Sequence, residues 1–78
     1  MLTAEQIKAA RALLNWGQRE LAAATGLSVP TIKRVEASRG AIRSTYTTVL
    51  AIQNAFEAEG IEFINEGGLG VKITAPKD

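Results

Sequence analysis

The fold is decided by the stretch from Gln18 to Ala37, which reads QRELAAATGLSVPTIKRVEA. Its small and apolar residues stand where two short helices joined by a tight turn require them. Ala22 carries only a methyl group, so a second helix can cross closely above it. Gly26 can adopt the positive φ that ends the first of these helices, a conformation that costs other residues about 1 kcal/mol or more. The stretch therefore predicts two crossed helices with Gly26 in the turn between them.

Another helix is predicted before this pair, starting near Ala4. Thr3 and Gln6 have the spacing of a capping box, in which each side chain binds a backbone group of the first helical turn. The helix is expected to end at Asn15 and Trp16. Its apolar residues at helical spacing, all expected to face the core, are Ile7, Ala10, Leu13 and Leu14.

The residues from Ser28 onward predict a third helix, a loop and a fourth helix. Ser28 is a suitable N-cap for the third helix, which should span about residues 28–37. Residues 38–43 form the loop, and Ser44 or Thr45 can cap the fourth helix. The loop thus separates the third predicted helix from the fourth.

After the fourth helix the hydrophobic period changes. Residues 61–64 and 71–74 form short apolar or alternating runs on either side of a glycine-rich turn, which predicts a β-hairpin. Residues 75–78 are expected to be a frayed end. The sequence therefore predicts a mainly α fold, with a bundle of about four helices over residues 1–60 and a hairpin extension with its tail over residues 61–78.

The composition excludes several classes of function. The chain has 78 residues and contains neither cysteine nor histidine, so thiolate and imidazole metal sites, disulfides, cysteine nucleophiles and histidine bases are ruled out. It has no acid–base pair or phosphate-binding glycine loop of an enzyme. We therefore expect a non-enzymatic cytoplasmic protein that needs no cofactor or metal, binds no membrane and responds to no small-molecule ligand.

The charges are distributed unevenly along the chain. Residues 1–43 carry seven basic and three acidic side chains, a net charge of +4, whereas residues 44–78 carry two basic and five acidic ones, a net charge of −3. Chance segregation in a short chain is one explanation of this asymmetry. The other is that the basic half neutralises phosphates and the acidic half stays away from them.

The segment AARALLNWGQRELAAATGLSVPTIKRVE, residues 9–36, resembles the phage repressor and Cro-like, or Xre-type, helix-turn-helix transcriptional regulators. The segment GIEFINEGGLGVKI, residues 60–73, resembles an extension common among small bacterial members. The resemblance implies a lambda-repressor-like bundle that binds double-stranded DNA and regulates transcription.

The resemblance also implies roles for three residues. Arg11 is expected to pair with Glu36 and join the first helix to the third, since family members often carry this pair. The alternative is that Arg11 contacts a DNA phosphate. Gln18 is expected to meet the DNA backbone at the start of the second helix, where free N–H groups also face phosphate, although it could be merely an exposed polar residue.

By the same resemblance, the third helix would lie in the major groove. Arg39 and Arg43 would flank it and suit phosphate anchoring. Val29 could at most touch a thymine methyl group, so we expect few direct base contacts. An ordinary solvated helix face is the alternative for the polar side chains. The third-helix residues that could face base edges are Ser28, Val29, Thr31, Lys33 and Arg34.

A regulator of this kind is expected to bind DNA as a homodimer, because one small module buries little surface on DNA. The hairpin or the fourth helix could supply the contact between the two copies. A lid over the chain's own core is the alternative role of the hairpin, and an antitoxin or scaffold with a protein partner is the alternative function. The hairpin residues expected at the dimer interface are Ile61, Phe63, Val71 and Ile73.

Overall fold

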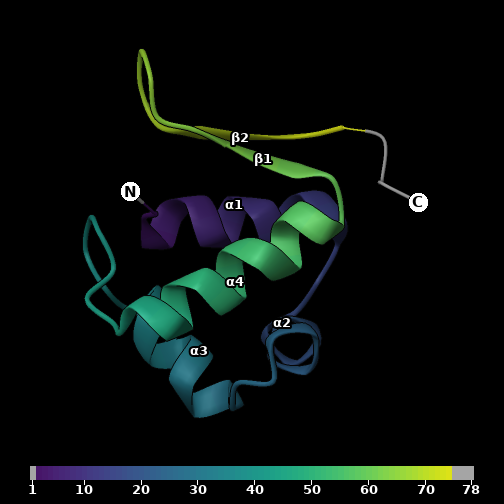
Figure 1. Ribbon diagram of the computed structural model, residues 1–78, viewed down its shortest axis with the longest axis vertical. Helices are drawn as coiled ribbons and strands as arrows, with labels where there is room; N and C mark the ends of the chain where they lie inside the picture. Colours follow the sequence, from purple (N-terminus) through teal and green to yellow (C-terminus); the bar gives the residue numbers. More distant parts are fainter. Residues whose placement is uncertain (1, 75–78) are drawn as a thin grey trace.

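The computed structural model describes residues 2–74, which form four helices followed by a two-stranded antiparallel hairpin (Figure 1). The mainly α fold expected from the sequence is therefore confirmed. The expected frayed end, residues 75–78, lies outside the described residues. The elements are α1 (Ala4–Leu14), α2 (Gln18–Thr25), α3 (Val29–Glu36), α4 (Tyr46–Ala58), β1 (Ile61–Ile64) and β2 (Gly70–Ile73).

Side-chain caps start three of the helices. The Thr3 hydroxyl accepts a hydrogen bond from the Gln6 backbone N–H at 3.2 Å, and the Gln6 side chain accepts one from the Thr3 N–H at 3.0 Å, which completes the capping box. As expected, Ser28 caps α3: its hydroxyl accepts a hydrogen bond from the Thr31 backbone N–H at 3.2 Å. Of the two residues considered for α4, Thr45 is the cap.

The turn between α2 and α3 depends on Gly26. Its φ is 77°, in the left-handed region, and its N–H donates to the Ala22 carbonyl at 2.9 Å. Ala22 itself is buried, as the crossing of two helices requires. Both residues therefore have the steric roles that the sequence predicts.

The core lies between the four helices and the hairpin. Trp16 stacks on Phe56 with ring centroids 5.8 Å apart, and Phe63 meets Phe56 edge-on at 5.9 Å. The expectation that Leu13 faces the core is wrong, because its side chain is 44% exposed. Leu13 lies about 120° around the helix from Ile7, at the edge of the buried stripe. The largest fully buried side chains are Ile7, Leu21, Ile32, Ile52 and Phe56.

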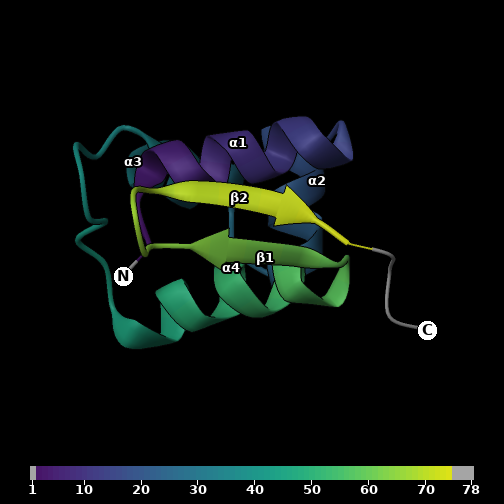
Figure 2. The same ribbon diagram turned by 90° about the horizontal axis from the view of Figure 1, so that it is seen from above.

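The hairpin lies across α1 and α4. Seen from above, β2 runs along α1 and β1 along α4 (Figure 2). Ile61 and Phe63 of β1 pair with Ile73 and Val71 of β2, respectively, so all four share one face of the hairpin. The amide of Gln6 donates to the Ile64 and Gly70 carbonyls, both at 3.1 Å, and to the Asn65 side chain at 2.9 Å. The helix cap therefore also anchors the hairpin.

The segment 38–43, expected to be a loop, pairs in part with the start of the chain. Thr3 and Ala41 form an antiparallel bridge, and the Ile42 N–H donates to the Leu2 carbonyl at 3.2 Å. The sequence pattern does not predict this pairing, because its partners are about forty residues apart. The bridge holds the loop that carries Arg39 and Arg43 against the bundle.

Candidate nucleic-acid interface

An ion pair joins α1 to the end of α3. Arg11 Nε donates to Glu36 Oε2 at 2.7 Å and Arg11 Nη2 donates to Glu36 Oε1 at 2.8 Å, a bidentate arrangement. Arg11 Nη1 also donates to the Trp16 carbonyl at 3.0 Å. The hydrogen bonding of the Arg11 guanidinium to the Glu36 carboxylate raises the pKa of Arg11 above its ordinary value, against the opposing effect of burial. The pairing is the one expected. It engages the Arg11 guanidinium with groups of the protein itself, and the Arg11 side chain is 19% exposed.

Gln18, the first residue of α2, is tied to the same carboxylate. Its Nε2 donates to Glu36 Oε1 at 3.1 Å, so Glu36 joins α1, α2 and α3. The Gln18 amide retains a second N–H and its carbonyl oxygen for other partners. The hydrogen bond to Glu36 therefore orients the Gln18 side chain, an arrangement that the sequence alone did not predict.

The outward face of α3 carries a row of polar side chains, one helical turn apart. The Ser28 hydroxyl caps the helix and lies 2.9 Å from the Thr31 hydroxyl. Arg34 Nη2 donates to that Thr31 hydroxyl at 3.4 Å. Lys33 and Arg34 are exposed, whereas Val29 is half-buried against the core. Of the five candidate base-reading residues, Lys33 and Arg34 thus present charge to solvent.

A shallow cleft of about 600 Å³ separates the start of α2 from α3. Arg19 lines it beside Lys33, so two cations flank the amino terminus of α2. Helix amino termini attract anions through their unpaired N–H groups and the helix dipole. Sequence reasoning missed Arg19, although its place directly after Gln18 in the first helical turn is a usable signal. The remaining residues that line the cleft are Gly17, Gln18, Glu20 and Val29.

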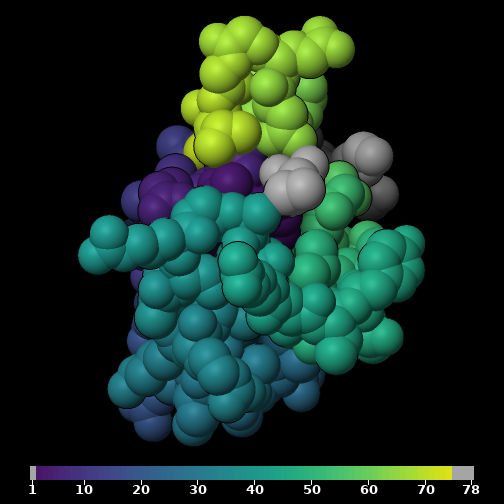
Figure 3. All heavy atoms as spheres, turned by 90° about the vertical axis from the view of Figure 1, so that its left-hand side faces the viewer, coloured from purple at the N-terminus to yellow at the C-terminus, as the bar shows by residue number. Residues whose placement is uncertain are grey.

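The two loop arginines are exposed, and the loop that carries them follows α3 directly. The α2–α3 pair forms one end of the molecule and the hairpin turn forms the other (Figures 1 and 3). Arg19, Lys33 and Arg34 therefore lie toward the end away from Glu62 and Glu66. The uneven distribution of charge along the sequence thus becomes a difference in charge between the two ends of the folded chain.

The four hairpin residues expected at a dimer interface have unequal exposure. Ile61 is only 3% exposed and belongs to the core of its own chain. Phe63 and Val71 are half-buried against the same core. Ile73 is 44% exposed. The lid alternative therefore fits three of the four residues, and Ile73 alone stands at the surface.

Residues 2–74 are the part of the chain that the structure describes. This part of the chain contains no group of three or more His, Cys, Asp or Glu side chains that could hold a metal ion. None of the helices in residues 2–74 has the length and hydropathy needed to cross a bilayer.

Comparison with known protein families identifies the domain. Residues 7–60 match the helix-turn-helix family HTH_3, which covers most of the chain and includes the whole Arg11–Glu36 brace and both crossed helices. No curated protein matches the chain significantly. The matched region, its four helices and the turn at Gly26 lead to one conclusion: the chain belongs to the Cro/C1-type (HTH_3) helix-turn-helix family of DNA-binding domains.

Proposed function

We propose that this protein is a transcriptional regulator that binds specific sites in duplex DNA as a homodimer, with α3 in the major groove. The observation that carries the proposal is the exposure of Lys33 and Arg34 on α3, together with the cleft in which Lys33 lies beside Arg19 and the amino terminus of α2. Cations next to unpaired helix N–H groups suit a phosphate backbone, and a helix of this size fits the major groove.

The residues divide into two kinds of contact. Residues at a helix terminus or on the loop that flanks α3 contact the DNA backbone. They are Gln18, Arg19, Arg39 and Arg43. Arg34 is the principal base reader, since a guanidinium can bind guanine with two hydrogen bonds.

The other α3 residues contribute less to base reading. Thr31 supports the Arg34 guanidinium through its hydroxyl. Lys33 adds charge, Val29 adds at most apolar contact, and the Ser28 hydroxyl is used for capping. Such a surface gives tight backbone binding and few directly read positions.

We expect a homodimer because the surface that one copy can bury on DNA is small. A single module buries little area on DNA, and two copies can read half-sites about 34 Å, or one helical turn, apart. We therefore expect a two-fold symmetric operator.

A binding selection from randomised duplex oligonucleotides tests the function. The wild-type protein should enrich a palindromic site, and its affinity should fall as salt rises. Arg34→Ala should relax the preference at one position in each half-site, because a bidentate contact contributes about 1–3 kcal/mol of discrimination. Arg39→Ala, the matched control, should weaken binding to all sequences alike. Absence of any salt-dependent duplex binding by the wild-type protein would refute the proposal.

A further inference from the structure

The outward side of α4 carries a stripe with the spacing of a helix–helix interface. Tyr46, Leu50, Gln53 and Glu57 are four, three and four residues apart, which places them on one face of the helix. Tyr46 is 78% exposed and Leu50 is 37% exposed. We call these four residues the outer stripe. Tyr46 and Leu50 thus place two large side chains with apolar surface on this face, one helical turn apart, which suits packing against a second helix.

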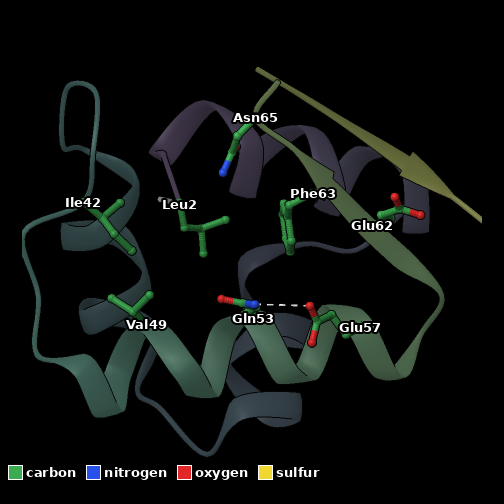
Figure 4. A pocket seen from close by; sticks show the side chains of 8 residues that line it. All are labelled: Leu2, Ile42, Val49, Gln53, Glu57, Glu62, Phe63 and Asn65. Carbon is green, nitrogen blue, oxygen red and sulfur yellow. Dashed lines mark hydrogen bonds between the residues drawn. The ribbon is translucent and has the colours of Figure 1, made fainter. Parts of the chain in front are cut away.

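A groove of about 330 Å³ runs beside the outer stripe, between α4 and β1 (Figure 4). Its apolar wall includes Val49 and Phe63, and Gln53 and Glu57 of the outer stripe form its edge, with a hydrogen bond of 3.2 Å between them. An exposed aromatic ring from another helix could lie in this groove and keep its hydroxyl at the polar edge.

The two ends of α4 carry opposite charge. Arg43 precedes the helix, and the positive end of the helix dipole lies next to it. Glu57 lies in the last turn of α4. Glu62 lies at the same end of the groove, opposite Ile42 (Figure 4). A second α4 in antiparallel orientation would bring the positive end of each helix to the negative end of the other. The face is therefore complementary to itself, as a two-fold interface requires.

We propose that a second copy of this chain packs against the outer stripe, with the two α4 helices antiparallel. The inference rests on the proposed homodimer and names its interface. A two-fold axis between Leu50 and Gln53 sets Tyr46 of each copy against Glu57 of the other, beside the groove. The tyrosine hydroxyl then donates to the carboxylate, and Arg43 approaches the same acidic end.

The arrangement agrees with DNA binding by both copies. The hairpin and the α2–α3 pair lie at opposite ends of the molecule, and α4 lies along one side (Figures 1 and 2). An axis that runs between these ends keeps both α3 helices at the same end of the dimer. Because α3 packs against α1 and α2, the two α3 helices lie apart on either side of the α4 pair, as separate half-sites need.

Leu50→Glu tests the interface, with Leu13→Glu as its matched control. Both leucines are partly exposed on helices, 37% and 44% respectively, but Leu13 lies on α1, away from the outer stripe. Leu50→Glu should weaken dimerisation by at least about tenfold in sedimentation velocity, as for a residue at the centre of an interface, and Leu13→Glu should not. Equal dimerisation of the two variants would overturn the inference.

Charge exchange tests the orientation. Arg43→Glu and Glu57→Arg should each weaken the free dimer, and the double variant should recover most of the loss, because the antiparallel contact is restored with its signs exchanged. Sedimentation without DNA separates this effect from any phosphate contact of Arg43. Additive losses in the double variant would exclude the antiparallel arrangement.

Cross-linking provides a measurement that does not depend on weakening the fold. The chain contains no cysteine, so Gln53→Cys introduces a single thiol near the proposed axis. A short bis-maleimide should join two copies of Gln53→Cys and should not join copies of Leu13→Cys. The reverse pattern would place the interface on α1 and refute the inference.

The outcomes distinguish this inference from the proposed function. A wild-type dimer that Leu50→Glu leaves intact refutes only this interface. A protein that stays monomeric, free and on DNA with two half-sites, refutes both the interface and the homodimer, while duplex binding by the monomer would still support a DNA-binding role. If a different protein binds a monomeric chain and Leu50→Glu abolishes that binding, the occupant is not a second copy and the inference is wrong.

Discussion

At the scale of single residues, Glu36 connects three helices of the bundle. Its side chain is 4% exposed and accepts hydrogen bonds from Arg11 on α1 and Gln18 on α2. A buried carboxylate is tolerated only when charge and hydrogen bonds compensate its lost hydration. The residue that ends α3 therefore sets the position of both α1 and the start of α2.

Arg11→Met should destabilise the fold by about 3 kcal/mol, because it leaves the Glu36 charge buried without its cation. Urea unfolding measures the change. The double variant Arg11→Met/Glu36→Met should lose less than Arg11→Met alone, since the isolated charge is gone. An Arg11→Met protein as stable as the wild type would show that the pair is not a structural brace.

At the scale of elements, the hairpin depends on α1 for its position. An isolated two-stranded hairpin is marginal in water, and here Ile61 and Phe63 pack on the core. The Gln6 amide adds hydrogen bonds to the carbonyls of Ile64 and Gly70, where the two strands approach their turn. Hydrophobic burial and one buried amide together hold the hairpin to the helices.

Gln6→Glu separates the two roles of this residue. A glutamate can still accept from the Thr3 N–H and complete the capping box, but it has no N–H to donate to the hairpin carbonyls. We expect a loss of about 1–3 kcal/mol from the hydrogen bonds that Gln6 no longer donates. Hydrogen exchange should show lower protection in the amides of β1 and β2 than in those of α1. Unchanged protection of the hairpin would show that Gln6 does not anchor it.

At the scale of the whole molecule, the charges form two opposed regions. Lys33 lies at the α2–α3 end and Lys72 lies on the hairpin, where it faces Glu62 at 3.6 Å. A polyanion should approach the first region and be repelled by the acidic second half. This distribution of charge supports the proposed approach of DNA to the α2–α3 end.

Lys33→Ala and Lys72→Ala test this orientation as a matched pair. Lys33→Ala should reduce the slope of log affinity against log salt by about 1, the value expected for one lost phosphate contact. Lys72→Ala should leave the slope unchanged. Equal effects of the two substitutions in a filter-binding or fluorescence titration would argue against the proposed face.

Several features followed from the sequence because their causes are local. Capping by Thr3 and Ser28 and the positive φ of Gly26 depend on groups within a few residues of each other. The Arg11–Glu36 pair came from the family resemblance. Leu13 was misassigned because helical periodicity defines a stripe and not its exact edge.

By itself, the sequence determined the order of the elements, their caps and turns, the family and the uneven distribution of charge. Only the tertiary structure decided that Gln18 is held by Glu36, that Gln6 reaches the hairpin and that Thr3 pairs with Ala41. Only the fold, likewise, leaves Tyr46 exposed on α4. The physical reason is range: caps and turns arise from contacts within one or two turns of chain, whereas these positions depend on how distant segments pack around a common core.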